Sequence, residues 1–286
     1  IYSIKSFMQW GTPEDLEDYI FTAKKVPINF KEIKIDCSSI VLMAGKGNRM
    51  KTIDKMKKPY LEINKYKLFE FCTKNIKTCK NDIYALNGDE EDKSHIELFK
   101  ESFPVFVGET LSSVETLHKA LDDLEISDNE SLLVMPCDSA IDFKWEEFLD
   151  FYKRSTNCEA IIFSFSGYPF ARWKPNQFGW LKVNPDYSIE SIGYKKGWDS
   201  KFLNPIVTGY FWFPNIGRLK NQLSNFLNIT DDDKKESSLD EFCDFLRSAD
   251  RTVYSYIVND FLCLGTSEEF RSYEYWLNAN EISRLN

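Results

Sequence analysis

The stretch Ile40-Val41-Leu42-Met43-Ala44-Gly45-Lys46-Gly47-Asn48-Arg49-Met50 joins an apolar run to a loop that contains two glycines and an arginine. The apolar run, residues 39–43, predicts a buried β-strand. Gly45 and Gly47 let the backbone after this strand approach a ligand closely and point several N–H groups toward it. Arg49 adds a guanidinium that grips phosphate oxygens. The stretch therefore predicts a strand followed by an anion-binding loop.

Two better-known glycine motifs fit this loop less well. A dinucleotide-binding fingerprint requires a third small residue where the chain has Met50, and it opens a helix at once. A Walker P-loop requires Gly-Lys followed by Ser or Thr, which the loop lacks. A plain structural turn is the remaining alternative. Arg49 and the downstream pair Lys58-Pro59 favour a ligand-binding loop over that alternative.

Outward from this stretch, strand-like and helix-like segments alternate. Strands are expected at residues 39–43, 82–86, 105–107, 132–135 and 160–165, and helices at 68–76, 95–103, 113–124 and 145–154. Three strands in succession are then expected at 178–183, 189–194 and 206–213, followed by helices at 221–227, 239–246 and 268–277. This order predicts an α/β fold: a doubly wound, mixed but mainly parallel sheet with helices on both faces. The three later strands predict a small antiparallel lobe over the carboxyl edge of the sheet.

Two distant segments of the chain resemble each other. Gly11-Thr12-Pro13-Glu14-Asp15-Leu16 aligns with Gly265-Thr266-Ser267-Glu268-Glu269-Phe270. At the same offset, Tyr2, Phe7 and Tyr19 meet Tyr256, Phe261 and Tyr273. Both copies carry a helix-start signal, so a chance match of two helix starts is the alternative. We predict that residues 1–30 are the tail of an upstream, similar module plus a linker, and that residues 36–286 form the main domain.

Composition narrows the class of protein. The 286 residues carry a net charge of -9, which argues against a nucleic-acid partner. The seven cysteines form no CxxC pair, which argues against a zinc ribbon or a thioredoxin-type site. The sequence contains no apolar run of the ~18 residues that a membrane span needs, and no secretory signal. We expect a cytoplasmic protein with reduced thiols and no membrane partner.

The glycine loop resembles the signature of the sugar-phosphate nucleotidylyltransferases, which is Ala-Gly-x-Gly-x-Arg followed by Pro-Lys-Pro-Leu. The chain keeps Ala44, Gly45, Gly47, Arg49, Lys58 and Pro59, and has Lys57 where the first proline is usual. The resemblance covers about residues 38–278 and implies a GT-A-like Rossmann fold. It also implies that the partners are an NTP and a small phosphorylated sugar or alcohol, with pyrophosphate released and Mg2+ as the cofactor.

Later segments resemble the family in the same order. Val134-Met135-Pro136-Cys137-Asp138 resembles the strand end that delivers a metal-binding aspartate, and a carboxylate at the end of a central parallel strand lies where such sheets bind ligands. The resemblance implies catalytic roles for Arg49, Lys58 and Asp138. Residues expected at the nucleotide are Met43, Ala44, Gly45, Lys46, Gly47, Asn48, Thr110 and Ser113. Residues expected at the acceptor substrate are Gly179, Lys195 and Gly209.

The closing segment departs from the family pattern. Many members carry an Asp directly before the Gly-Thr turn as a second metal ligand, whereas this chain has Cys263 there. Asp260 is the nearest carboxylate, so we predict Asp138 and Asp260 as the metal ligands. The alternative for Asp260 is a solvated acid at a strand end. A further departure, Tyr194 in place of Glu, leaves the register between Lys195 and Lys196 open.

Two other functions stay open at this point. A GT-A glycosyltransferase requires an Asp-x-Asp motif at the end of a central strand, where this chain has Asp138-Ser139-Ala140. Asp231-Asp232-Asp233 contains that pattern within a charged segment, which favours a solvated loop. A non-catalytic nucleotide-binding module is the other alternative, since Cys263 and Tyr194 depart from the family. A role in capsule or surface-glycan precursor synthesis is implied by resemblance alone.

Overall fold

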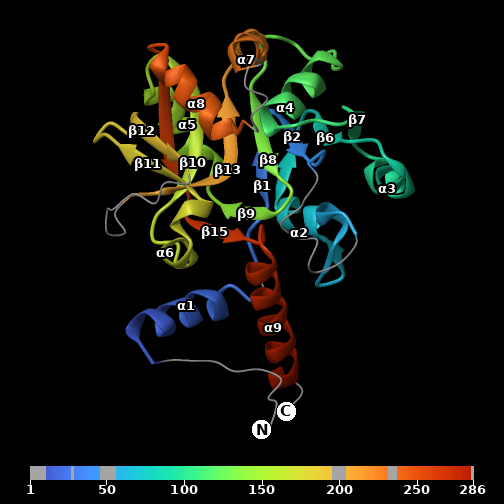
Figure 1. Cartoon of the computed structure of the whole chain (residues 1–286), viewed down its shortest axis with the longest axis vertical. Helices are drawn as coiled ribbons and strands as arrows, with labels where there is room; N and C mark the ends of the chain where they lie inside the picture. Colours follow the sequence, from blue (N-terminus) through green and yellow to red (C-terminus); the bar gives the residue numbers. More distant parts are fainter. Residues whose placement is uncertain (1–10, 27–28, 46–55, 195–203, 231–236, 285–286) are drawn as a thin grey trace.

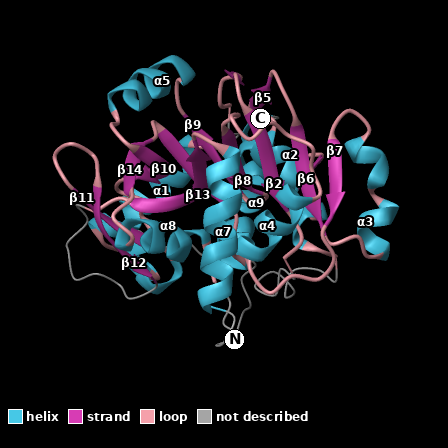
Figure 2. Cartoon of the chain, turned by 90° about the horizontal axis from the view of Figure 1, so that it is seen from above, coloured by secondary structure: helices cyan, strands magenta, loops and turns pink. Residues whose placement is uncertain are grey.

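A computed structural model describes residues 11–26, 29–45, 56–194, 204–230 and 237–284. Within these residues, nine strands form one twisted sheet (Figures 1 and 2). Seven of them run in the order β12-β11-β13-β8-β2-β6-β7, while β10 pairs with β13 and β14. Their bounds are β2 Ser38–Leu42, β6 Asp82–Leu86, β7 Phe103–Phe106, β8 Leu132–Pro136, β10 Cys158–Phe165, β11 Gly179–Val183, β12 Ile189–Tyr194, β13 Ile206–Phe213 and β14 Thr252–Ile257.

The centre of the sheet is parallel. Strand β2 lies between β6 and β8 and runs parallel to both, with Leu42 opposite Pro136 at the carboxyl end. Strand β13 is antiparallel to β8 and to β10. A parallel sheet has both faces covered, so its strands are continuous apolar runs. The sequence Ile40-Val41-Leu42 has this property, and the predicted doubly wound, mainly parallel fold is confirmed.

Helices cover both faces of the sheet, as Figure 2 shows. Alternate residues of β2 point to opposite faces, so Ile40 and Val41 belong to different cores. Ile40 packs in the core of α4 (Ser113–Asp122), α7 (Ile216–Thr230) and α8 (Leu239–Ser248). Val41 packs in the core that contains Phe148 of α5 (Trp145–Arg154).

Smaller elements complete the carboxyl edge and the rim. Strand β9 (Ser139–Asp142) pairs antiparallel with β15 (Asp260–Cys263). The short strands β1 (Ile33–Ile35) and β5 (Ile76–Thr78) pair in parallel, and β3 (Glu62–Ile63) forms a hairpin with β4 (Tyr66–Lys67). The remaining helices are α2 (Leu68–Thr73), α3 (Glu90–Ser94) and α6 (Phe170–Trp173), with 3₁₀ turns at Lys58–Tyr60, Ile96–Phe99 and Pro175–Gln177.

Several predicted elements were wrong in extent or place. The helix expected over 68–76 ends at Thr73, because Ile76 joins a strand. The helix expected over 95–103 is a 3₁₀ turn, and Phe103 opens β7. Short apolar runs suit either a helix or a strand, and the pairing partner decides between them. The expected antiparallel lobe is also not a layer over the edge, because β11 and β12 continue the main sheet beyond β13.

The two ends of the described chain meet below the sheet. Helices α1 (Pro13–Lys24) and α9 (Ser267–Arg284) extend together beyond the body of the fold (Figure 1). The Tyr19 ring lies 4.9 Å from the Trp276 ring, and Val26 shares a core with Tyr273. Part of the segment expected to be an upstream tail is therefore packed against the main domain.

Candidate active site

The site is built where β2 and β8 end side by side. Strand β2 leads into Met43, Ala44 and Gly45, and strand β8 leads into Asp138. Met43 and Ala44 are buried and fix the start of the loop. A Cβ atom added at Gly45 would meet no protein atom within 4 Å, so packing does not demand glycine there. The backbone of Gly45 therefore borders open space at the carboxyl edge of the sheet.

Lys58 and Asp138 form an ion pair at this edge. The 3₁₀ turn after Lys57 presents the Lys58 ammonium, which contacts the Asp138 carboxylate and donates to the Gly265 carbonyl at 3.1 Å. Only 9% of the Lys58 side chain and 16% of the Asp138 side chain are exposed. The Asp138 carbonyl accepts from the Leu264 N–H at 2.8 Å. The segments that contain Lys58, Asp138 and Gly265 are far apart in the sequence, and they meet at this ion pair.

Two glycines allow this convergence. Gly209 has φ +89°, and a Cβ atom there would lie 3.1 Å from Pro136, directly before the loop that carries Asp138. A Cβ atom at Gly265 would lie 3.1 Å from the Asp138 carboxylate and 3.2 Å from the Cys263 sulfur. Glycine is the residue that tolerates both the positive φ and the close approach. The structure therefore brings Gly209 beside the strand end that leads to Asp138.

Gly179 lies elsewhere. A Cβ atom at this position would fall 2.3 Å from the Asp240 carboxylate of α8, so helix packing explains the glycine. The expected place of Gly179 at the acceptor substrate stays a prediction. Lys46, Gly47, Asn48, Arg49 and Lys195, together with the Asp231-Asp232-Asp233 run, lie outside the described residues.

Asp260 is not a neighbour of Asp138. In the β9–β15 ladder, Cys263 faces Ser139 and Asp260 faces Asp142, at the far end. Three residues of strand span about 10 Å, whereas Mg2+ binds oxygen at about 2.1 Å. The Asp260 carboxylate instead pairs with the buried ammonium of Lys25. The strand register therefore contradicts the prediction that Asp138 and Asp260 bind the same metal ion.

Cys263 occupies the place nearest to Asp138 on β15. Burial raises the pKa of its thiol well above the ordinary value, and the nearby carboxylates of Glu269 and Asp138 raise it further. The thiol therefore stays protonated and donates to Glu269 at 3.5 Å. Among the residues that the structure describes, no group of three His, Cys, Asp or Glu side chains is arranged to hold a metal ion.

The loop expected at the nucleobase is held by its own hydrogen bonds. The Thr110 hydroxyl is buried and bonds to the Thr116 hydroxyl at 2.7 Å. The cap of α4 is Ser112, which accepts from the Glu115 N–H, and Ser113 is the first helical residue. The Thr110 hydroxyl thus has a partner within the protein, and the expected contact of Thr110 and Ser113 with the nucleotide stays a prediction.

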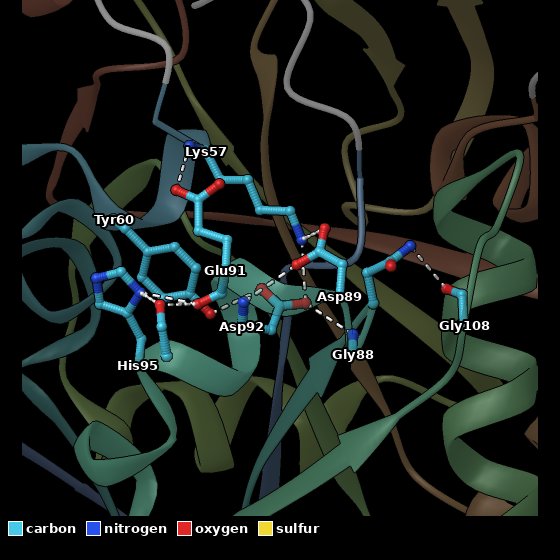
Figure 3. Close-up of polar contacts among 10 residues, drawn as sticks. Lys57, Tyr60, Gly88, Asp89, Glu91, Asp92, His95 and Gly108 are labelled. Atoms are coloured by element: carbon cyan, nitrogen blue, oxygen red, sulfur yellow. Dashed lines mark hydrogen bonds and ion pairs between the residues drawn. The ribbon is translucent and has the colours of Figure 1, made fainter.

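A second charged cluster, missed by sequence reasoning, holds the segment before Lys58 (Figure 3). The Lys57 ammonium pairs with Asp89 and Asp92, and the Lys57 N–H donates to Glu91 at 2.7 Å. The Asp92 side chain is only 1% exposed and also accepts from Tyr60 at 2.8 Å. Proline, the usual residue at position 57 in the resembled family, has no N–H to make this bond. The acidic run after residues 82–86 was the available signal.

The cluster also joins the loops that follow β6 and β7. The Asp92 carboxylate accepts from the Gly88 N–H at 2.7 Å, and Asn87 donates to the Gly108 carbonyl at 3.1 Å. The ring of His95 stacks on Tyr60 at 4.1 Å. Burial raises the pKa of Tyr60, and the Asp92 charge raises it further, so the phenol stays a donor. The loops after β6 and β7 are therefore tied to the segment that carries Lys58.

Residues 39–222 match the model of the MobA-like NTP transferase domain. The chain belongs to this family and is a nucleotidyltransferase. No curated protein sequence matches it. In the described part of the chain, the helices are too short or too polar to cross a membrane.

Solved structures share this fold at low sequence identity. The nucleoside-diphosphate-sugar pyrophosphorylase from Vibrio cholerae RC9 has a TM-score of 0.65 at 14% identity, over 84% of this chain and 99% of its own. The UTP-bound UGPase from Acinetobacter baumannii has a TM-score of 0.62 at 14% identity, over 88% and 98%. The inositol-1-phosphate CTP transferase from T. maritima has a TM-score of 0.58 at 14% identity, over 84% and 95%.

Proposed function

We propose that the chain transfers a nucleoside monophosphate from an NTP to a phosphorylated sugar or small phosphorylated alcohol and releases pyrophosphate. The observation that carries this proposal is the Lys58–Asp138 pair at the joined ends of β2 and β8. Gly45, which follows β2 at the same edge of the sheet, has no protein atom within 4 Å of the position that a Cβ atom would take. The family match supports the nucleotidyl transfer, and the acceptor class is our inference.

The reaction needs no protein base. A phosphate oxygen of the acceptor is already anionic, so it can attack the α-phosphorus of the NTP in line with the leaving pyrophosphate. Catalysis then depends on positioning and on charge stabilisation. We assign Lys58 to the α-phosphate, Arg49 and the loop from Gly45 to the leaving phosphates, and Lys195 to the acceptor phosphate. The assignment of Lys58 to the α-phosphate is supported by the contacts of its ammonium with the Gly265 carbonyl and the Asp138 carboxylate.

The donor set at the site fits Mg2+ bound jointly with phosphates. Mg2+ in nucleotide sites takes one or two carboxylates and completes its shell with phosphates and water. Asp138 supplies one carboxylate, partly exposed at the strand end. Asp260 is held by Lys25, so we assign Asp138 alone as the protein ligand. When bound, Mg2+ would offset negative charge on the phosphates.

The acceptor class is supported by the names of structural neighbours. One is an inositol-1-phosphate CTP transferase, and another is a putative glucose-1-phosphate thymidylyltransferase from Bacillus anthracis. Both names describe a small phosphorylated alcohol or sugar. Gly209, whose backbone lies beside Pro136, is the described residue that we place nearest the acceptor. Precursor synthesis for a capsule or another surface glycan is the cellular role that we propose.

A pyrophosphate-release assay tests this function. The chain is incubated with each NTP, Mg2+ and a panel of hexose 1-phosphates, phosphocholine, phosphoglycerol and inositol 1-phosphate. We expect pyrophosphate release that depends on both one NTP and one acceptor. Release of a nucleoside diphosphate from a nucleotide sugar would instead identify a glycosyltransferase. Nucleotide binding without turnover across the whole panel would identify a non-catalytic module.

A further inference from the structure

Helices α1 and α9 begin in the same way. Thr12 caps α1 by accepting from the Asp15 N–H, and the Asp15 carboxylate accepts from the Thr12 N–H. At the start of α9, the Thr266 hydroxyl accepts from the Glu269 N–H at 3.3 Å and also bonds to the Glu269 carboxylate at 2.8 Å. The two helix starts that align in sequence are thus alike in structure.

Helices α1 and α9 pack together at positions that align in the repeat. The Tyr19 ring packs 4.9 Å from the Trp276 ring. In the sequence repeat Tyr19 aligns with Tyr273, and Thr22 aligns with Trp276. The aligned residues Thr22 and Tyr273 both line one small cavity, which Tyr168, Phe170 and Leu262 of the domain also line.

The two helices differ in what covers them. On α9, Phe270 and Tyr273 are 2% and 1% exposed, because they pack on Leu61 and Leu264 of the domain. The counterpart of Phe270 on α1 is Leu16, which is 44% exposed. Ile20, one turn further along α1, is 38% exposed. The apolar side chain of Phe270 on α9 is therefore buried in the domain, whereas the aligned side chain of Leu16 on α1 is exposed.

We propose that the Leu16 and Ile20 side of α1 is covered by a second module of this same fold that precedes α1 in the polypeptide, with α1 as its terminal helix. The helix pair α1–α9 then joins the two modules. The repeat is the reason for proposing a module of the same fold. Helix α9 covers part of the described domain, so the similar helix α1 is expected to cover part of a similar domain. This proposal does not depend on the reaction that the site performs.

One buried lysine attaches the end of α1 to the described domain. Lys25, directly after α1, donates to the Phe261 carbonyl at 3.0 Å and pairs with the Asp260 carboxylate. Its side chain is only 7% exposed, and the ammonium also lies 4.1 Å from the Phe21 ring. Both acceptors belong to β15, the strand that leads to Gly265 and its contact with Lys58. The second module would therefore be anchored on the strand that borders the active site.

Thiol labelling tests the proposal. Leu16→Cys is made in a Cys79→Ser background, both in the 286-residue chain and in the complete translation product of the reading frame. We expect the introduced thiol to react roughly tenfold or more slowly in the complete product, because a covered site is protected from solvent. Ile229→Cys on α7, where the native side chain is 67% exposed, is the matched control and should react equally in both.

Two results would overturn the proposal. One is a reading frame that encodes no preceding module with its own Ala-Gly-x-Gly-x-Arg loop. The other is an equal labelling rate of Leu16→Cys in the two proteins while the Ile229→Cys control behaves as expected. Neither result would bear on pyrophosphate release, so a failure here is distinct from a failure of the proposed function.

Discussion

The Lys58 ammonium is held between the Asp138 carboxylate and the Gly265 carbonyl. Asp138 follows a central parallel strand, and Gly265 follows β15, near the carboxyl end of the chain. The pair is almost buried, so its charges are less screened than those of a surface pair. This arrangement fixes a cation at the edge of the sheet where a nucleotide phosphate would bind.

Replacing Lys58 by methionine should lower kcat by about 100-fold or more, since one lost electrostatic donor to a transition state costs that much. The apolar stem of the side chain is retained, so we expect the fold to persist. Pyrophosphate release measures the rate, and circular dichroism checks the fold. A rate close to that of the native chain would show that Lys58 does not contact the reacting phosphate.

Lys57→Met should affect stability more than chemistry. The variant leaves the buried Asp92 carboxylate without its cation, which should cost about 1–3 kcal/mol of unfolding free energy. Lys93→Met is the matched control, because Lys93 and Glu90 form an exposed pair worth no more than about 0.5 kcal/mol. Urea denaturation compares the two. Equal losses in both variants would contradict a structural role for the Lys57 cluster.

Gly265→Ala should act on the rate through Asp138. The added methyl group would lie 3.1 Å from the Asp138 carboxylate and 3.2 Å from the Cys263 sulfur, so these groups must shift by a few tenths of an ångström. Small displacements of a catalytic group reduce the rate by up to about 100-fold. We expect a lower kcat with a nearly unchanged unfolding midpoint. A native kcat in this variant would mean that the Asp138 position is not critical.

Glu269 should make stability depend on pH. Burial raises the pKa of its carboxyl, although hydrogen bonds from Tyr168 and Thr266 lower it in part. Above the pKa of the unfolded chain, the folded state then binds more protons, so the free energy of unfolding falls as pH rises through the raised pKa. Glu269→Gln cannot titrate, and its stability relative to the native chain should increase as pH rises above the ordinary carboxyl pKa of about 4.

Urea denaturation at a series of pH values measures this difference. Glu268→Gln is the matched variant, because Glu268 lies on the exposed side of the same helical turn. An identical pH trend in both variants would contradict the role given to the buried Glu269 carboxyl.

The sequence predicted the central sheet and the strand end at Asp138 well, for a physical reason. Strands that are buried on both faces of a parallel sheet leave continuous apolar runs, so residues 39–43, 82–86 and 132–135 could be found without a structure. The chain segment that follows such a strand lies at its carboxyl edge, which placed Gly45 and Asp138 at the same edge of the sheet.

The errors came from features that depend on tertiary register. Asp260 and Cys263 are both close to the Gly-Thr turn in sequence, but only the pairing of β15 with β9 shows that Cys263 is the one near Asp138. The sequence also could not show that the Asp240 side chain, on a helix about 60 residues later, lies against the Cα of Gly179. Spacing along the chain reveals neither contact.

The most direct test compares Asp138→Asn with Asp142→Asn, two changes of the same kind at the two ends of β9. With the NTP and acceptor that the native chain uses, Asp138→Asn should lose at least about 1000-fold in pyrophosphate release, because several kcal/mol of stabilisation depend on it. Asp142→Asn should stay within about threefold of the native rate, since four residues of extended chain, about 13 Å, separate Asp142 from Asp138. Native-like turnover by a folded Asp138→Asn variant would contradict the assignment of the active site.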